Sequence, residues 1–344
     1  MKIDMNYVLE RLEKLLNIPS PSGNTENAIS FVEEEFKAMG IASYRTNKGA
    51  LVATIEGENT DKEITLSGHV DTLGGMVKEI KSDGRLKLTQ IGGYVWSTVE
   101  GEYVTIETLE GKKYTGTILT TAASSHVHGS ETETIERNSA NMEVRLDEKV
   151  HNAEDVGKLG INVGDFVFYD PRAIITDSGF IKSRHLDDKA GVASILGIAK
   201  YFIDNNIKPK YTTNFFISNY EEVGHGASAA IPEKTVEFIA IDMAAPGSGQ
   251  TSDEFSVTIC AKDSSGPYSF ELKKRLIDLA KENNIEYKID IYPYYGSDGS
   301  ATLRAGNDFK VGLIGPGVDA SHSFERTHKD AIENTIKLGV AYLR

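Results

Sequence analysis

Two adjacent acids, Glu221 and Glu222, stand where an apolar run ends in the segment FFISNYEEVGHGAS, residues 215–228. Neighbouring carboxylates repel each other and are easily solvated on a surface, so their place at the end of a buried strand needs an explanation. At a metal centre, one acid can bind an ion while its neighbour carries a proton. The pair therefore points to a metal centre at which the two acids have different roles.

Further acids and histidines follow apolar, strand-like segments elsewhere in the chain. They are His69 and Asp71 in EITLSGHVD, Asp187 and Asp188 in SRHLDDKAG, Asp242 in VEFIAIDM, and His322 and His328 in GLIGPGVDASHSFERTH. In open α/β sheets, ligands bind beyond the carboxyl ends of the strands, so these side chains are expected at one edge of a sheet. Each one alone has a structural explanation, as a hydrogen-bonded histidine, a helix cap or a solvated loop acid. Together they favour a shared cation, because buried unpaired carboxylates are costly.

The residue types suit a centre of two divalent ions. Such ions lie about 3.5–4 Å apart and need a bridging carboxylate together with one or two further ligands each. His69 and Asp242 would serve one ion. Glu222 and His322 would serve the other, and Asp187 would bridge the two.

Two acids then remain for other tasks. Asp71 lies two residues beyond His69, on the same side of an extended chain, and can accept the second N–H of the imidazole. Glu221, which stands beside the ions without binding them, can take a proton from a water that bridges the ions and return it to a leaving amine. The expected catalytic residues are therefore Glu221 and Asp71.

Composition limits the classes of partner. The 344 residues carry a net charge of −14, from 37 basic and 51 acidic residues, which argues against nucleic acid or an anionic membrane as a partner. No apolar run is long enough to span a bilayer, and the N-terminus is typical of an amphipathic helix rather than a signal peptide. Cys260 is the only cysteine, which excludes internal disulfides and thiolate zinc sites. We expect a cytoplasmic location.

The pattern of elements predicts an α/β domain that is interrupted by a β domain. Residues 1–75 and 178–344 alternate between helical and strand-like segments, whereas residues 76–177 contain short alternating segments separated by Gly or Asp turns. Helices are expected at about 4–17, 25–39 (with Asn24 as its cap), 189–204 (strongly amphipathic), 267–284 (with Pro267 in its first turn) and 329–343. Within residues 76–177, only NAEDVGKLG favours a helix.

The motifs GHVDT, LDDKAG, EEVGHGA, AIDM and SHSFE occur in the order and approximate spacing of the M42 family of di-metal aminopeptidases, which the chain resembles over essentially its whole length. The resemblance implies a mixed-sheet, three-layer catalytic domain like that of the zinc exopeptidases, with a small β-barrel-like insertion. It also implies two divalent ions per subunit, of zinc, cobalt or manganese, and release of N-terminal residues from peptides.

The resemblance transfers roles to individual positions. The family's metal ligands match His69, Asp187, Glu222, Asp242 and His322, its general acid/base matches Glu221, and the acid behind the first histidine matches Asp71. It further implies a cis peptide bond between Asp187 and Asp188. By the same resemblance we expect a homo-oligomer that is built from dimers through the β insertion and assembles further into a dodecamer.

Some segments depart from the family pattern or lie outside its known motifs. Lys189 stands where arginine is commoner, an exchange of one cation for another that should matter little. His225, and Asp298 with its neighbours in YYGSDGSATLRAG, are candidates for the substrate pocket. His126 and His128, in the polar segment 124–152, could form a second metal site, although a solvated loop is the better interpretation.

Two other functions remain open from the residues. A glycoside hydrolase would also use paired carboxylates, but it would need neither His69 nor His322 and would favour exposed aromatic side chains. A catalytically silent scaffold would keep the metal ligands but would not need Glu221. The preference for an acidic, basic or aliphatic first residue does not follow from the sequence, because loops build the pocket.

Overall fold

The computed structural model describes residues 1–344, which form two compact units. Unit 1 contains Met1–Asp71 and Arg172–Arg344, and unit 2 contains Thr72–Pro171. Both boundaries lie a few residues earlier than the sequence pattern suggests. The second boundary differs because β10 (Ile174–Ile175) pairs with β11 (Phe180–Ser183), which itself pairs with β18 (Glu325–His328) in unit 1.

A nine-stranded mixed sheet is the frame of unit 1. Its order is β1-β2-β12-β3-β13-β17-β14-β15, with β16 also paired to β14. The strands are β1 (Ala42–Arg45), β2 (Leu51–Ile55), β3 (Asn59–His69), β12 (Tyr211–Ser218), β13 (Thr235–Ile241), β14 (Val257–Asp263), β15 (Gly266–Pro267), β16 (Tyr287–Ile291) and β17 (Lys310–Pro316). Because β12, β3, β13 and β17 are mutually parallel, their carboxyl ends share one edge.

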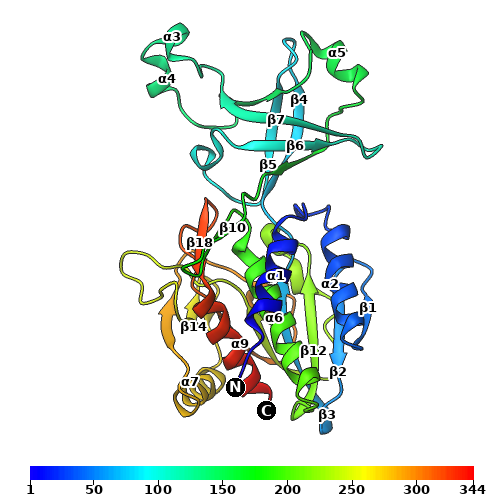
Figure 1. Ribbon diagram of the computed structural model, residues 1–344, viewed down its shortest axis with the longest axis vertical. Helices are drawn as coiled ribbons and strands as arrows, with labels where there is room; N and C mark the ends of the chain where they lie inside the picture. The colour runs from blue at the N-terminus through cyan, green and yellow to red at the C-terminus, as the bar shows by residue number, and fades with distance from the viewer. The chain divides into compact units, whose positions relative to one another are not determined.

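Helices cover both faces of this sheet. One face packs against α1 (Met5–Leu16), α2 (Glu26–Ala38), α6 (Leu186–Asp204), α7 (Phe270–Glu282) and α9 (Lys329–Leu343) (Figure 1). The shorter α8 (Asp298–Arg304) lies against β13 and β17. Side chains alternate between the two faces as a pleated strand requires, since Phe215 and Ile217 join one hydrophobic cluster and Phe216 joins another.

Helix α6 is buried on nearly every side and is not the amphipathic helix that we expected. Its residues from Leu186 to Ala199 are buried, because α1 and α9 cover the side that faces away from the sheet. None of the helices combines the length and apolar character that crossing a bilayer requires.

Two helix starts differ from those expected. Helix α2 begins after Thr25 rather than Asn24, and Thr25 makes no capping hydrogen bond with its side chain. Helix α7 begins after Ser269, whose hydroxyl accepts the backbone N–H of Leu272. Pro267 instead lies in β15, opposite Lys262, so the serine cap and not the proline determines where α7 starts.

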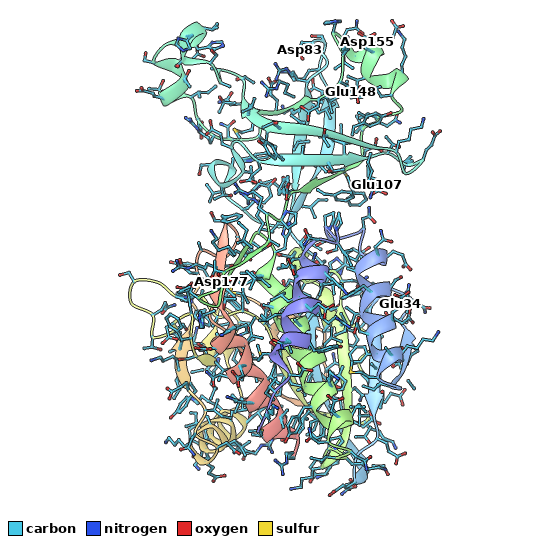
Figure 2. All side chains as sticks on the ribbon, in the orientation of Figure 1. Glu34, Asp83, Glu107, Glu148, Asp155 and Asp177 are labelled. Atoms are coloured by element: carbon cyan, nitrogen blue, oxygen red, sulfur yellow. The ribbon has the colours of Figure 1, made fainter.

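Unit 2 is a closed barrel of six strands in the order β4-β5-β8-β7-β6-β9, which confirms the expected β insertion. The strands are β4 (Gly74–Ile80), β5 (Leu86–Ile91), β6 (Tyr103–Glu107), β7 (Lys113–Thr120), β8 (Met142–Leu146) and β9 (Phe166–Tyr169). The expected helix is α5 (Ala153–Lys158), and one-turn helices form at Trp96–Val99, α3 (Ser125–His128) and α4 (Glu131–Thr134). Acids such as Asp83 and Glu148 in this unit and Glu34 in unit 1 are exposed, so much of the negative charge is a solvated surface (Figure 2).

Candidate metal centre

Neighbouring strands bring the predicted residues to one edge of the sheet. His69 ends β3, and Glu221 and Glu222 follow β12 in the short helix η2 (Glu221–Val223). Asp242 directly follows β13. Since β12, β3 and β13 are adjacent and parallel, these side chains meet at their carboxyl ends. The candidate ligands therefore lie beyond the carboxyl ends of these strands, where α/β sheets bind ligands.

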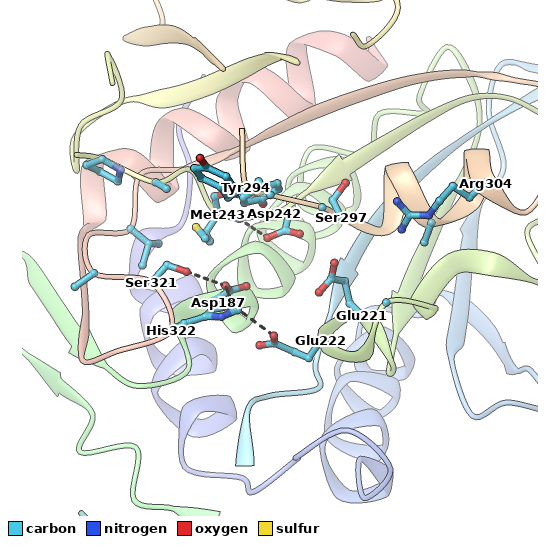
Figure 3. A pocket seen from close by; sticks show the side chains of 18 residues that line it. Asp187, Glu221, Glu222, Asp242, Met243, Tyr294, Ser297, Arg304, Ser321 and His322 are labelled. Carbon is cyan, nitrogen blue, oxygen red and sulfur yellow. Dashed lines mark hydrogen bonds and ion pairs between the residues drawn. The ribbon is translucent and has the colours of Figure 1, made fainter. Parts of the chain in front are cut away.

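Asp187 stands between two groups of possible ligands. One of its carboxylate oxygens lies 3.3 Å from Nε2 of His69, and the other lies 3.3 Å from Nε2 of His322. Asp242 completes the first group and Glu222 the second, and within each group the ligand atoms lie within 4.8 Å of one another. Figure 3 shows Asp187, Glu222, Asp242 and His322 turned toward a common cavity.

The orientation of the His69 ring suits a metal ligand. Its Nδ1 atom lies 2.9 Å from the backbone oxygen of Asp71. A carbonyl oxygen only accepts hydrogen bonds, so Nδ1 carries the proton, and in the neutral imidazole Nε2 keeps a free electron pair. That Nε2 atom and Oε1 of Glu222 are buried without a hydrogen-bond partner. Buried nitrogen and oxygen atoms that have an electron pair and no hydrogen-bond partner can bind a cation.

The charges at the site are unbalanced without a cation. Burial, followed by the charge of Asp187, raises the pKa of Asp242 to about 7 and that of Glu222 to about 8. Burial also raises the pKa of Glu221 well above its usual range. Although burial opposes its protonation, the hydrogen bond to Asp187 raises the pKa of His322 to about 10. Divalent cations would neutralise these carboxylates in place of protons.

The carboxylate of Asp71 has different partners from those expected. It lies 3.5 Å from Nδ1 of His69, which is long for a hydrogen bond, and the nearer acceptor is the backbone oxygen of Asp71 itself. The two carboxylate oxygens accept the backbone N–H groups of Glu221 at 3.1 Å and Glu222 at 3.2 Å. The hydroxyl of Ser22 donates to one of them at 2.5 Å. Asp71 therefore holds the turn that carries both acids.

Two further buried acids support the candidate ligands, and the sequence alone did not single them out for this task. Asp188 accepts the backbone N–H of His69 at 3.2 Å, and Glu325 accepts that of Asp187 at 3.0 Å. The peptide bond between Asp187 and Asp188 is cis, as the family resemblance implied. The available signal was position, since Asp188 adjoins one candidate ligand and Glu325 follows His322 by three residues.

Lys189 does not behave as a simple replacement for arginine. Its ammonium group is buried and donates to the backbone oxygen of Ile18 at 2.7 Å. Burial lowers the pKa of Lys189 to about 7, whereas an arginine would stay charged. The two cations therefore differ in how burial affects their charge at this position.

The candidate ligands open into a cavity of about 610 Å³. Apart from the ligands and Glu221, its walls include Met243, Ala245, Pro246, Tyr294, Tyr295, Gly296, Ser297, Arg304, Val318 and Ser321. The segment YYGSDGSATLRAG thus contributes to the pocket through Tyr294–Ser297, Ala301 and Arg304, which are neighbours of Asp298 that the sequence did not name individually.

Neither pocket candidate named from the sequence lines this cavity. His225 is exposed and stacks on Tyr220, with ring centroids 4.9 Å apart. Asp298 is 2% exposed and accepts hydrogen bonds from the Ser67 hydroxyl at 2.6 Å and the Ala227 amide at 2.9 Å. Its buried carboxylate needs these donors, so it holds the loop behind the pocket wall.

The remaining histidines lie outside the two ligand groups. His328 precedes α9, where its Nδ1 accepts the Asp330 amide and its Nε2 lies 2.9 Å from the backbone oxygen of Ser178. In unit 2, His126 is exposed, and Nδ1 of His128 lies 3.6 Å from Glu131. No group of three possible ligands forms around either of these two histidines, which favours the solvated-loop interpretation.

Comparisons with known proteins agree with this geometry. The family model of M42 glutamyl aminopeptidases matches residues 49–338. The Bacillus subtilis (strain 168) protein YhfE, which carries the name of an aminopeptidase, is 53% identical over 336 residues, spanning 98% of this chain and 97% of YhfE. The chain belongs to the M42 family of peptidases. It is accordingly a hydrolase that acts on peptides, in a family that depends on metal.

Solved structures show the same fold. The Pyrococcus horikoshii TET1 peptidase superposes with a TM-score of 0.86 at 24% identity, covering 98% of this chain and 99% of that one. A Thermotoga maritima protein named endoglucanase matches less well, with a TM-score of 0.76 at 20% identity over 97% of this chain and 96% of that one. A protein named for the glycoside hydrolase activity that the sequence left open therefore has the same fold, but its TM-score is lower than that of the TET1 peptidase.

Proposed function

We propose that this protein is an aminopeptidase that releases N-terminal residues from peptides at a centre of two divalent cations. The observation that carries the proposal is the placement of Asp187, whose two carboxylate oxygens face two different imidazoles at 3.3 Å each. A carboxylate shared in this way, with one further oxygen ligand on each side, is the arrangement that a two-metal hydrolase requires.

The proposed ligands divide between the two ions. His69 and Asp242 would hold one ion, Glu222 and His322 the other, and Asp187 both. A mixed set of imidazoles and carboxylates suits zinc or cobalt, with manganese as the next choice. Ions held by these residues would supply an activated water and would polarise the carbonyl of the scissile bond.

Glu221 is the proposed general acid and base. It lines the cavity beside both ligand groups but belongs to neither. Burial raises its pKa above the usual range of a carboxyl group, which suits a residue that must both accept and return a proton near neutral pH. It would take the proton of the attacking water as the new C–O bond forms, and give that proton to the amine as the C–N bond breaks.

We also propose that the first residue of the preferred substrate is acidic, as the glutamyl name of the matched family suggests. Arg304 is the one Arg or Lys among the lining residues, and its guanidinium forms no ion pair. An unpaired guanidinium recognises a carboxylate better than an ammonium or an apolar group. In Figure 3, Arg304 extends from α8 toward the cavity on the side of Glu221.

Activity with aminoacyl-anilides tests the proposed function. Protein that is stripped with a chelator and reconstituted with Zn²⁺ or Co²⁺ should cleave anilides with a free α-amine and leave N-acetylated versions intact. A stripped sample should lose this activity and regain it on reconstitution. Cleavage of N-acetylated substrates at equal rates would contradict the aminopeptidase proposal.

The same samples separate the two alternatives. Hydrolysis of a β-glucan that survives the chelator would favour the glycoside hydrolase. Two bound ions without hydrolysis of any peptide or anilide would favour the catalytically silent scaffold. We expect neither outcome, because Glu221 lines the cavity beside the ligand groups and a scaffold would have no use for the proton carrier proposed there.

A further inference from the structure

Glu325 is a buried acid that belongs to neither ligand group, and the proposed mechanism does not use it. It begins strand β18 and is 1% exposed. Its register partner is Ser183, the last residue of β11. Strand β11 leads directly into the segment that contains Asp187, so Glu325 lies beside the entry to the candidate bridging residue.

Both oxygens of this carboxylate accept backbone N–H groups of candidate ligands. Oε2 accepts the amide of Asp187 at 3.0 Å, and Oε1 accepts the amide of His322 at 3.1 Å. Asp187 and His322 lie on segments that are far apart in the sequence, and each contributes to the second ligand group. A single side chain therefore ties together the two backbone segments from which this group is built.

The backbone at His322 needs such support. Its φ angle is +62°, and that of Ala320 is +57°, a left-handed conformation that costs non-glycine residues energy. The neighbouring Ser321 hydroxyl donates to Asp187 at 3.2 Å. The loop is thus held in an unfavourable conformation that directs the His322 imidazole toward Asp187 and Glu222.

We infer that Glu325 is a positioning residue for the second metal ion, because its carboxylate fixes the separation of Asp187 and His322 before the ion binds. The inference rests on the proposed two-metal centre. It has a parallel within the site, since Asp71 holds the amides of Glu221 and Glu222 in the same manner. A purely structural acid would stabilise the fold without changing the relative affinity for two ions.

Glu325→Gln tests the inference with nearly unchanged shape. Glutamine keeps one acceptor oxygen, but its NH₂ group faces the other backbone N–H, so one of the two hydrogen bonds is lost. Isothermal titration of metal-free protein with Zn²⁺ should show that binding of the ion between Asp187, Glu222 and His322 weakens by about 10- to 100-fold. The ion at His69 and Asp242 should be affected less. The visible spectrum of the Co²⁺ form should change more for the second ion than for the first.

Glu143→Gln is the matched control, because Glu143 is also buried and lies in the barrel of unit 2, paired with Lys81. This variant should bind both ions as the unmodified protein does. If the Glu325 variant binds each of the two ions as tightly as the Glu143 variant does, the inference is overturned and the two-metal centre stays intact. An unmodified protein that binds no divalent ion would instead overturn the centre itself.

Hydrogen exchange of the unmodified metal-free protein gives a second test, which does not depend on whether the variant folds. The backbone amides of Asp187 and His322 should exchange at least about 100-fold more slowly than unprotected amides, because the buried Glu325 carboxylate accepts a hydrogen bond from each of them. Exchange at the rate of an open loop would contradict the proposed role of Glu325 in preparing the site.

Discussion

At the scale of single residues, the site depends on where each carboxylate finds its partners. Glu221 and Glu222 are neighbours in the chain, yet only Glu222 joins a ligand group. Asp71 accepts the amides of both, so the turn that separates their side chains is fixed from behind. Adjacent acids can therefore take different roles because a third, buried acid holds their backbone.

Replacement of Glu221 by glutamine should separate metal binding from catalysis. The variant should retain both ions, since Glu221 belongs to neither ligand group, but its turnover should fall by about 10²- to 10⁴-fold. Metal content and kcat measured on one preparation check this. Glu34→Gln, at an exposed position on α2, is the control and should leave both quantities unchanged. Unchanged turnover in the Glu221 variant would remove it from its proposed role.

The metal-free protein should become less stable as the pH rises. The folded-state pKa values of Asp242, Glu222 and His322 are raised from 3.8, 4.5 and 6.5 to about 7, 8 and 10. A raised pKa means that the folded state binds more protons than the unfolded state, so this stability is lost as the pH rises through the folded pKa. Thermal unfolding from about pH 6 to about pH 9 should show a falling Tm, which added Zn²⁺ should reverse. A Tm that rises over this range would contradict the assignment.

At the scale of elements, the parallel strands determine where the ligands meet. Strand β17 passes so close to the end of β13 that a Cβ atom on Gly315 would lie 1.7 Å from the backbone oxygen of Asp242. Only glycine allows this approach. The position of Asp242 therefore depends on a neighbouring strand as well as on its own.

Gly315→Ala should displace the end of β13. The clash with backbone cannot be relieved by a side-chain rotation, so we expect a loss of about 1–3 kcal/mol or more in the free energy of unfolding, together with weaker metal binding. Urea denaturation and metal titration measure the two effects. Gly247→Ala is the control, because a Cβ atom there meets nothing within 4 Å. Equal stability of the two variants would show that the strand end can shift freely.

Helix α8 determines the charge of the pocket wall through Arg304. If Arg304 recognises an acidic first residue, Arg304→Gln should lower kcat/KM for glutamyl-anilide by about 10- to 100-fold and leave that for leucyl-anilide nearly unchanged. Charge reversal to glutamate should favour lysyl-anilide. If leucyl- and glutamyl-anilide lose activity equally, the substrate preference proposed here is wrong, whereas the aminopeptidase proposal stands.

At the scale of the whole molecule, unit 2 is a closed barrel with several exposed apolar side chains. Leu109 is 91% exposed, and Val95, Tyr103 and Val163 are each more than half exposed. Side chains of this kind often mark contacts between protein chains. They are compatible with the homo-oligomer built from dimers, up to a dodecamer, that the family resemblance of the sequence implies.

Native mass spectrometry measures that assembly. The purified protein should give masses that are even multiples of the single-chain mass, with the dimer as the smallest abundant species. Leu109→Lys should shift the distribution toward the monomer, because a charge replaces an exposed apolar side chain. A monomer as the only species, at protein concentrations at which enzyme assays are run, would contradict the proposed assembly.

The sequence by itself determined the α/β frame, the β insertion and the residues that could bind metal. These follow from local information, since hydrophobic periodicity reports each strand and the acid or histidine after it is visible in the same segment. The motif order then identified the family, which the comparisons show.

Only the tertiary structure decided which side chains act together. The carboxylate of Asp71 holds a turn that lies 150 residues away in the chain, and Glu325 binds the backbone of Asp187, 138 residues before it. His225 and Asp298, in contrast, do not line the pocket. His225 stacks on Tyr220 at the surface, and Asp298 accepts hydrogen bonds in a buried network. A side chain's direction and partners depend on elements that are distant in sequence and adjacent in space, and local pattern carries no record of that proximity.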